Sequence, residues 1–264
     1  MKFKITLLST LLITILLTSC SKNFYQVYNV KPDSNIKENG KYLLFEDENC
    51  IVKYNFWSNG GNSGFNFYNK TNKDIFINLD KSFFIYNGIA NNYFKNRTLT
   101  EKTKLNLSTS INVNHSFNNV DGDIYLESPI TKDYSVSFKE NKIICIPSKT
   151  SKIITEYNVK EFLYEDCDFL KYPTKKNIES KSFIKSESPI IFSNRICYQI
   201  QNSSSIIKFE NEFYISKITN YPESKILESR YEKNCNEKST ILTKHFKNIK
   251  PNQFYIKYSK KTLE

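Results

Sequence analysis

The chain has 264 residues, of which 39% are hydrophobic and 15% are aromatic. Its 18 tyrosines and 20 phenylalanines bury a large area per residue, so this composition supports a packed core and excludes a disordered chain. The formal charge of +11 is scattered rather than gathered in one lysine-rich block. That distribution argues against a nucleic-acid partner and favours a basic surface that faces anionic lipid.

The first 20 residues have the layout of a secretory signal. Lys2 and Lys4 precede an apolar run from Ile5 to Leu17, and small residues lead to Cys20. This run is shorter than the about 20 apolar residues of a transmembrane helix. The ending Leu-Thr-Ser-Cys resembles a bacterial lipobox, which implies diacylation of Cys20 and cleavage before it. The mature protein would then be held on a membrane by its first residue.

The residues after Cys20 bear on its destination. Position 21 is Ser rather than Asp, and no acidic run follows. By resemblance to lipoprotein sorting rules, this favours the outer membrane of a diderm bacterium, facing the periplasm more than the surface. Residues 1–19 are thus predicted to be the signal peptide. Residues 20–40 are polar, with turn signals near Pro32 and Gly40, and are predicted to be a lipidated tether.

From residue 41 onward, the pattern predicts β structure. Cys50, Val52 and Tyr54 would share one face of a strand, because alternate residues of a strand point the same way. Further short segments are rich in aromatic and β-branched residues and are separated by turn signals, including Asn87-Gly88. This spacing is typical of an antiparallel sandwich. The strands are expected at 42–46, 51–57, 65–68, 75–80, 82–86, 89–94, 134–138, 142–147, 152–157, 190–200, 206–209, 212–218 and 254–258.

Other segments break the strand pattern. Residues 97–123 are rich in Thr, Ser and Asn, and we expect a long surface loop or mobile insertion there, with a possible subdivision of the domain near 97–133. A capping box formed by Asn158 and Glu161 predicts a short helix over 159–167. A second helix is expected over 222–234, with Pro222 in its first turn. Residues 219–264 could form an appendage.

Five cysteines remain once Cys20 is assigned to lipid. They are Cys50, Cys145, Cys167, Cys197 and Cys235. An oxidising compartment would allow at most two disulfides among them and leave one thiol over, without fixing the pairing. Their spacing is wide and contains no Cys-x-x-Cys, so neither a zinc site nor a thioredoxin-like motif is indicated. Cys145 lies in an apolar run and is expected to be a small core residue.

Signals for catalysis or metal binding are weak. His115 and His245 are the only histidines, and neither belongs to a His-Glu-x-x-His motif. Asp121 and Asp123 resemble the start of a calcium loop, but the later ligands are missing, and we expect a turn. The glycine-rich loop 59–64 lacks the Lys-Ser/Thr of a P-loop and is expected to join two strands. We therefore predict no cofactor, no metal site and no catalytic residue.

We expect a membrane-anchored cell-envelope lipoprotein that acts by binding or as part of an assembly, and two more specific alternatives stay open. The first is an envelope hydrolase that uses Glu165, Asp166 or Asp168, because paired carboxylates can catalyse glycoside hydrolysis. The second is a carbohydrate- or surface-ligand-binding lipoprotein, because an exposed ring at Trp57 or Tyr93 could stack on a sugar.

Three segments resemble recurring parts of uncharacterised exported bacterial lipoproteins. They are FNFYNKTNKDIFINLDKSFFIYNG at 65–88, IICIPSKTSK at 143–152 and FYISKITNYP at 213–222. The resemblance covers most of the mature chain and implies an immunoglobulin-like β architecture, with no assigned activity. We thus expect a mostly β, antiparallel immunoglobulin-like β-sandwich over 41–264, with one or two short helices and a long polar insertion. Its expected partners are membrane lipid, through acylated Cys20, and an envelope protein or glycan.

Overall fold

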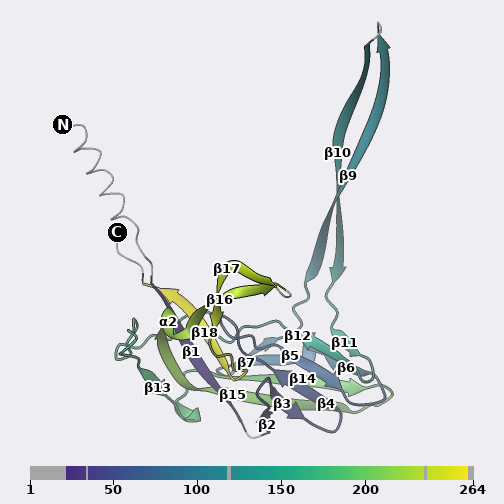
Figure 1. Ribbon diagram of the computed structural model, residues 1–264. Coiled ribbons are helices and arrows are strands. Elements are labelled where there is room, and N and C mark those ends of the chain that lie inside the picture. Colours follow the sequence, from purple (N-terminus) through teal and green to yellow (C-terminus); the bar gives the residue numbers. More distant parts are fainter. Residues whose placement is uncertain (1–21, 34, 118–119, 235–236, 261–264) are drawn as a thin grey trace, which may run out of the picture. The chain divides into compact units, whose positions relative to one another are not determined.

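The computed structural model describes residues 22–260, apart from residue 34, residues 118–119 and residues 235–236 (Figure 1). Cys20 and the predicted signal peptide lie outside the described residues. The strands pair antiparallel throughout the named sheets, which confirms the predicted mostly β, antiparallel class. The chain divides into two compact units: residues 94–142 form one, and the segments before and after them form the other. Within the described residues, no helix has the length and hydropathy to cross a membrane.

The larger sheet belongs to the first unit and contains nine strands. Its path runs through β11 (Ile143–Ile146), β6 (Ile75–Asn78), β14 (Ile191–Ile200), β15 (Ile206–Pro222), β1 (Asn23–Pro32) and β18 (Gln253–Ser259). Off this path, β7 (Phe83–Tyr86) pairs with β14 and with β8 (Ile89–Asn92), and β13 (Ser180–Ser182) pairs with β15.

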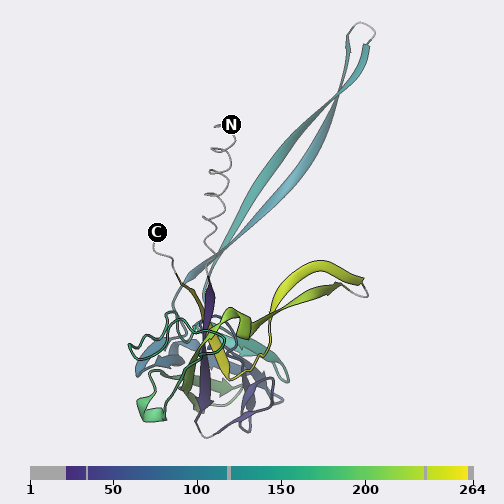
Figure 2. The ribbon, with the colours of Figure 1, turned by 60° about the vertical axis from the view of Figure 1, so that its left-hand side comes forward.

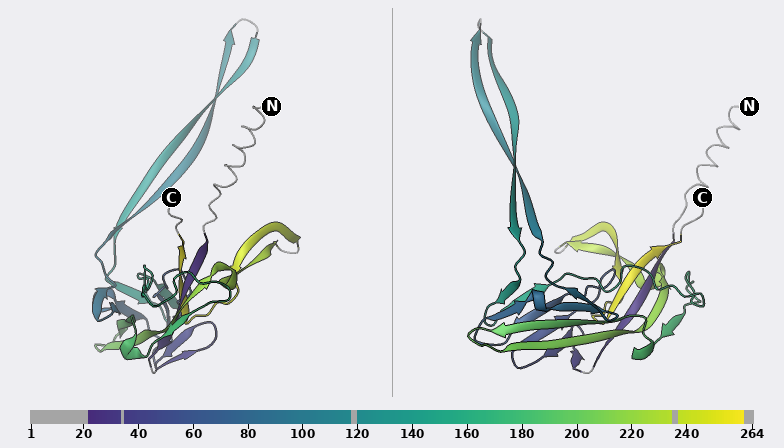
Figure 3. Two further views of the ribbon diagram at one scale, coloured as in Figure 1. Left: turned by 90° about the vertical axis from the view of Figure 1, so that its left-hand side faces the viewer. Right: turned by 180° about the vertical axis from the view of Figure 1, so that it is seen from behind.

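A second sheet of five strands has the order β12 (Ser151–Ile154), β5 (Phe65–Asn69), β4 (Cys50–Tyr54), β3 (Leu43–Glu46) and β2 (Ile36–Glu38). Figure 3 shows the ribbon from two further sides. Aromatic rings from both sheets form the core. The ring of Tyr54 lies 5.1 Å from that of Phe213, and Phe67 lies 5.7 Å from Tyr198. All four rings are almost fully buried, so the abundance of aromatic residues explains how a chain of modest hydrophobicity fills a core.

Local strand predictions hold where alternation and turn residues coincide. In β4 the three buried residues are Cys50, Val52 and Tyr54, which confirms that they share the inner face. Between β7 and β8, Asn87 and Gly88 have φ values of 46° and 83°. Two consecutive positive φ values define the hairpin turn that Asn-Gly favours.

The predicted tether over 20–40 is wrong from Asn23 onward. β1 lies between β15 and β18 inside the larger sheet, and it buries Phe24, Tyr25, Val27 and Tyr28. Buried residues occur on both faces of this strand, so the simple alternation of a half-exposed strand is absent. The composition of 21–39 as a whole is polar, and this average masks the apolar run within it.

The predicted loop or mobile insertion over 97–123 is instead part of a hairpin. β9 (Thr98–Phe117) and β10 (Val120–Lys139) pair along their whole length, from Thr98 opposite Lys139 to Phe117 opposite Val120. Asp121 and Asp123, expected in a turn, belong to β10. Next to the open end of this hairpin, where Thr98 pairs with Lys139, the Arg97 guanidinium lies 2.7 Å from the Glu140 carboxylate.

Both predicted helices are also corrected. Residues 155–179 contain turns and bends with no helix, and residues 222–234 hold only the single turn α2 (Glu223–Ile226) before β16 (Leu227–Asn234) begins. The other helices among the described residues, η1 (Leu79–Lys81) and η2 (Lys185–Glu187), are short 3-10 turns. One turn of helix is too short to be stable by itself, so pairing with neighbouring strands decides these segments.

The C-terminal region is divided between two structures. β15 extends to Pro222 and β18 pairs with β1, so residues 219–222 and 253–259 belong to the larger sheet rather than to an appendage. Between them, β16 and β17 (Glu237–Phe246) form a separate two-stranded ribbon (Figure 2). The predicted hairpin of 206–209 and 212–218 is one continuous strand, β15.

Candidate functional site

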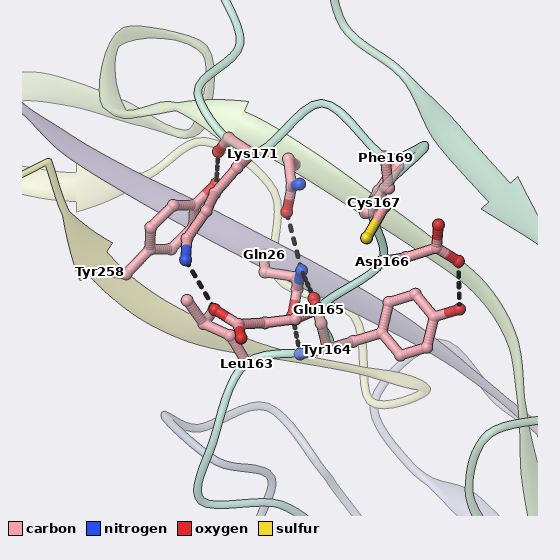
Figure 4. Close-up of a pocket in the computed structure, with 10 residues that line it drawn as sticks. Gln26, Leu163, Tyr164, Glu165, Asp166, Cys167, Phe169, Lys171 and Tyr258 are labelled. Atoms are coloured by element: carbon pink, nitrogen blue, oxygen red, sulfur yellow. Dashed lines mark hydrogen bonds and ion pairs between the residues drawn. The ribbon is translucent and has the colours of Figure 1, made fainter.

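A hollow of about 280 Å³ lies where the irregular segment 163–171 covers one face of β1, β15 and β18 (Figure 4). Gln26 of β1 is opposite Asn220 of β15, and both side chains line the hollow with Tyr258 of β18. The covering segment contributes Tyr164, Glu165, Asp166, Cys167 and Lys171 among others. The site therefore joins three strands of the sheet to one loop.

Gln26 holds this loop in place. Its side-chain amide donates to the carbonyl oxygen of Tyr164 at 3.0 Å and accepts from the Tyr164 backbone N–H at 2.7 Å. The same amide nitrogen donates to Asn220 Oδ1 at 3.0 Å, and Asn220 in turn donates to the carbonyl of Leu170 at 2.8 Å. Both amides are 2% exposed. Buried polar groups need such partners, so this network stabilises a loop that has no regular structure.

The structure brings Glu165 and Asp166 to the hollow, and each has a lysine partner. The Glu165 carboxylate lies 2.6 Å from the Lys171 ammonium, whose hydrogen bond lowers the pKa of Glu165. Asp166 pairs with Lys181, and this hydrogen bond is the main cause of the lowered pKa of Asp166. Tyr164 donates its hydroxyl to Asp166 at 2.9 Å as well.

Asp168 does not line the hollow. Its backbone N–H donates to Asp166 Oδ1 at 3.0 Å, which closes a local turn. A glycosidase needs one carboxyl group whose pKa is raised so that it can act as an acid. Here, the pKa values of Glu165 and Asp166 shift in the opposite direction, and the ion pairs are those of a solvated loop.

The cysteines are distributed over both surface and core. Cys50 and Cys197 are buried, Cys145 and Cys167 are exposed, and these four described cysteines are free thiols. Cys235 lies outside the described residues. The expectation of a buried Cys145 is wrong, because its strand β11 is at the edge of the larger sheet and only Ile146 of that strand is buried.

The rings proposed for sugar binding are engaged in packing. Tyr93 is 3% exposed, and its hydroxyl donates to Asn194 Oδ1 at 2.5 Å. The Trp57 ring meets Phe246 edge-on at 5.0 Å and lies 5.3 Å from Tyr255. The Tyr93 ring is therefore buried away from any ligand, whereas Trp57 is half-exposed.

A second hollow of about 380 Å³ lies on the opposite face of β1. It is lined by Asn23 and Tyr25, which alternate with the residues of the first hollow, and by Glu223, Lys244 and Lys257. Glu223 pairs with Lys244, which lowers the pKa of Glu223, and accepts from Asn23 Nδ2 at 2.9 Å. Burial, followed by the charge of Glu223, raises the pKa of Tyr25 to about 12.

His245 lines neither hollow. The exposed His245 on β17 lies with its Nε2 2.7 Å from Thr243 Oγ1, and His115 belongs to β9. Among the described residues, no group of three histidine, cysteine or acidic side chains is placed to hold a metal ion.

Sequence reasoning missed Gln26 and Asn220. The available signal was a polar residue within an apolar run, as in Phe24-Tyr-Gln-Val-Tyr28. A buried amide in a strand marks a place where another segment must supply hydrogen bonds. Nothing in the sequence identified that segment as residues 163–171. No family model, curated protein or solved structure matches this chain.

Proposed function

We propose that this protein is a cell-envelope lipoprotein, anchored to a membrane through acylated Cys20, that acts by binding or assembly rather than by catalysis. The observation that carries the proposal is the apolar signal ending in Leu-Thr-Ser-Cys20, which lies immediately before the first strand of the domain. The signal would export the chain, and the cysteine would keep it at the bilayer.

The distance from anchor to domain supports this proposal. β1 begins at Asn23, three residues after Cys20, and a chain of that length spans at most about 11 Å. A lipid on Cys20 would therefore hold the start of β1 close to the membrane surface. This placement differs from that of a domain on a long flexible tether.

The charges near the same end of the sheet fit an anionic membrane. Asn23 at the start of β1 is opposite Ser259 at the end of β18, and the N–H of Lys260 donates to the carbonyl of Lys22 at 3.3 Å. Lys22, Lys257 and Lys260 are exposed there. Each lysine close to an anionic surface adds about 1 kcal/mol of attraction, so the group would reinforce the lipid anchor.

The ion pairs and lowered pKa values of the acidic side chains favour binding over catalysis. Glu165, Asp166 and Glu223 are each paired with a lysine, and each has a lowered pKa. These carboxylates are suited to holding loops and strands together. A triple substitution of Glu165, Asp166 and Asp168 by alanine tests the hydrolase alternative, since loss of a measured turnover would favour catalysis.

Metabolic labelling with palmitate tests the anchor directly. The wild-type protein is expected to take up the label and to fractionate with membranes, whereas Cys20→Ser should remain unlabelled. Cys167→Ser is the matched control, because Cys167 is exposed but lies outside the signal, and it should be labelled like the wild type. An unlabelled wild-type protein in the cytosol would overturn the proposal.

The kind of partner is tested separately. Cross-linking in intact envelopes, followed by identification of the attached molecule, should yield an envelope protein. The glycan alternative would instead be supported by a reproducible hit of the purified protein on a glycan array.

A further inference from the structure

The β9–β10 hairpin has two faces of opposite character. Residues directly opposite each other in an antiparallel pair share a face, and alternate residues along each strand do so too. The pairing of Ile111 with Leu126 therefore places the odd-numbered residues of β9 with the even-numbered residues of β10. Thirteen of the twenty residues on this face are Leu, Ile, Val, Phe or Tyr. We call it the apolar face.

The opposite face is polar throughout. Of its twenty residues, eighteen are Ser, Thr, Asn, Asp, Glu or Lys, the exceptions being Tyr125 and Pro129. The described side chains near the open end of the hairpin agree with this division into an apolar and a polar face. Thr100 and Ser137, both on the polar face, share a hydrogen bond of 2.9 Å across the two strands, whereas Phe138 on the apolar face is 45% exposed.

An apolar face of this size needs a covering surface. Within the described part of the chain, β9 and β10 pair only with each other. An isolated two-stranded hairpin is marginally stable in water, and a contiguous apolar patch on a soluble surface marks an interaction site. Three opposed pairs on this face, Leu107–Ile130, Ile111–Leu126 and Val113–Ile124, are apolar on both strands, and the polar pair Thr109–Ser128 lies between the first two.

We propose that the apolar face of the β9–β10 hairpin binds the same face of a second copy of this chain, so that the two hairpins form a small four-stranded sandwich. Two ribbons packed in this way would lie about 10 Å apart, as stacked sheets do. Their polar faces would remain in water.

The area of the face matches what a dimer needs. A strand of 20 residues is about 66 Å long, and two paired strands are about 10 Å wide. Two such faces packed together bury about 1,300 Å² in total, which lies within the range of stable protein interfaces. The charged residues of the face are Glu101 and Lys132, which have opposite signs and leave it without net charge.

The unpaired edges of the hairpin favour a second copy of the chain over lipid as the surface that covers the apolar face. Each edge carries backbone N–H and C=O groups along 20 residues, and these need water or another partner. In the hydrocarbon of a bilayer, such open edges are too costly to occur. In a sandwich of two hairpins, they remain at the solvated rim.

The test uses full-length chains with two different affinity tags, produced in the same cells. Capture of one tagged chain from detergent extracts should bring down the other. The double variant Ile111→Lys/Leu126→Lys places two charges in the centre of the apolar face and should lower the affinity about a hundredfold. Asn112→Lys/Tyr125→Lys adds the same charge to the neighbouring pair on the polar face and should leave capture unchanged.

Further controls exclude trivial outcomes. In one control, each tagged chain is produced in its own culture, and the two detergent extracts are mixed afterwards. Capture in this mixture would show how much of the signal comes from copies that only share a detergent micelle. Ile111→Thr/Leu126→Thr keeps residues that favour strands, so reduced capture by this milder variant would reflect loss of contact rather than of the hairpin. Absence of capture between wild-type copies would overturn the proposal, as would equal loss with both lysine variants. If lipid vesicles alone, without a second copy of the chain, protected the apolar face from proteolysis, the face would bind lipid, and this result would also overturn the proposed dimer.

Discussion

Gly61 lies against the face of the Phe254 ring. A Cβ atom built on Gly61 would be 2.8 Å from Phe254 Cγ, which is closer than side-chain carbons approach. Gly61 also has a φ of 75°, in the region that favours glycine. Its N–H and carbonyl bond to Ser58 and Val159, so the loop between β4 and β5 is fixed to both β18 and residues 158–160. This loop is a packed part of the core boundary.

Substitution of Gly61 by alanine should therefore destabilise the protein in two ways. The positive φ costs about 1 kcal/mol, and displacement of the Phe254 ring costs about 2 kcal/mol more. Gly40→Ala is the matched control, because Gly40 has a φ of 82° but nothing within 4 Å of its added Cβ. Urea denaturation should give a clear difference in the free energy of unfolding between the variants. Equal values would show that the ring contact is unimportant.

Gln26→Ala should release the loop 163–171. The substitution removes both side-chain bonds to Tyr164 and the bond to Asn220, and it leaves buried donors and acceptors without partners. We expect a loss of about 3 kcal/mol in the free energy of unfolding. The loop should also become sensitive to limited proteolysis. Gln201→Ala, at an exposed turn, should change stability by less than about 0.5 kcal/mol. Unchanged proteolysis of the Gln26 variant would contradict the assigned role.

Buried tyrosines should make the protein sensitive to alkali. Burial raises the pKa of Tyr25 to about 12 and raises those of Tyr28, Tyr54 and Tyr198 further. In the unfolded chain, these phenols ionise near pH 10. Deprotonation therefore favours the unfolded state, and stability should fall as the pH rises from about 10 through 12.

Tyrosinate absorbance and circular dichroism, followed together during alkaline titration, check this expectation. Ionisation of the buried tyrosines should coincide with unfolding. Tyr25→Phe should unfold at higher pH than the wild type, whereas Tyr231→Phe, at a ring 63% exposed, should not change the midpoint. Complete ionisation before any loss of structure would show that these phenols are accessible in the native state.

The four described thiols should differ in reactivity. Cys145 and Cys167 are exposed, whereas Cys50 and Cys197 are 0% and 2% exposed. Burial and the nearby Asp47 carboxylate raise the pKa of Cys50, which further lowers its thiolate fraction. Alkylation of the reduced native protein, mapped by mass spectrometry, should modify Cys145 and Cys167 first. Cys50 and Cys197 should react after addition of denaturant, and their early modification would contradict the buried assignment.

Short-range signals explain which parts of the structure were predictable. The alternation Cys50-x-Val52-x-Tyr54 and the dipeptide Asn87-Gly88 depend on neighbouring residues, and both predictions are confirmed. The helix expected from Asn158 and Glu161 is absent. Instead, the N–H groups of Val159 and Lys160 bond to the carbonyls of Gly61 and Gly60, about 100 residues away in sequence. Distant partners outweighed a local capping motif.

Residue pattern alone was sufficient to predict the mostly β class, because strand alternation is a property of adjacent residues. The same kind of local pattern carries the prediction of a secretory signal that ends in Cys20. The tertiary structure alone decided that Asn23–Pro32 is an inner strand, that Gln26 supports a loop from residue 163 onward, and that β9 and β10 combine their apolar residues on one face. Each of these features depends on which distant strand lies alongside. Strand register is a long-range property, and a shift of one residue would have moved every side chain to the other face.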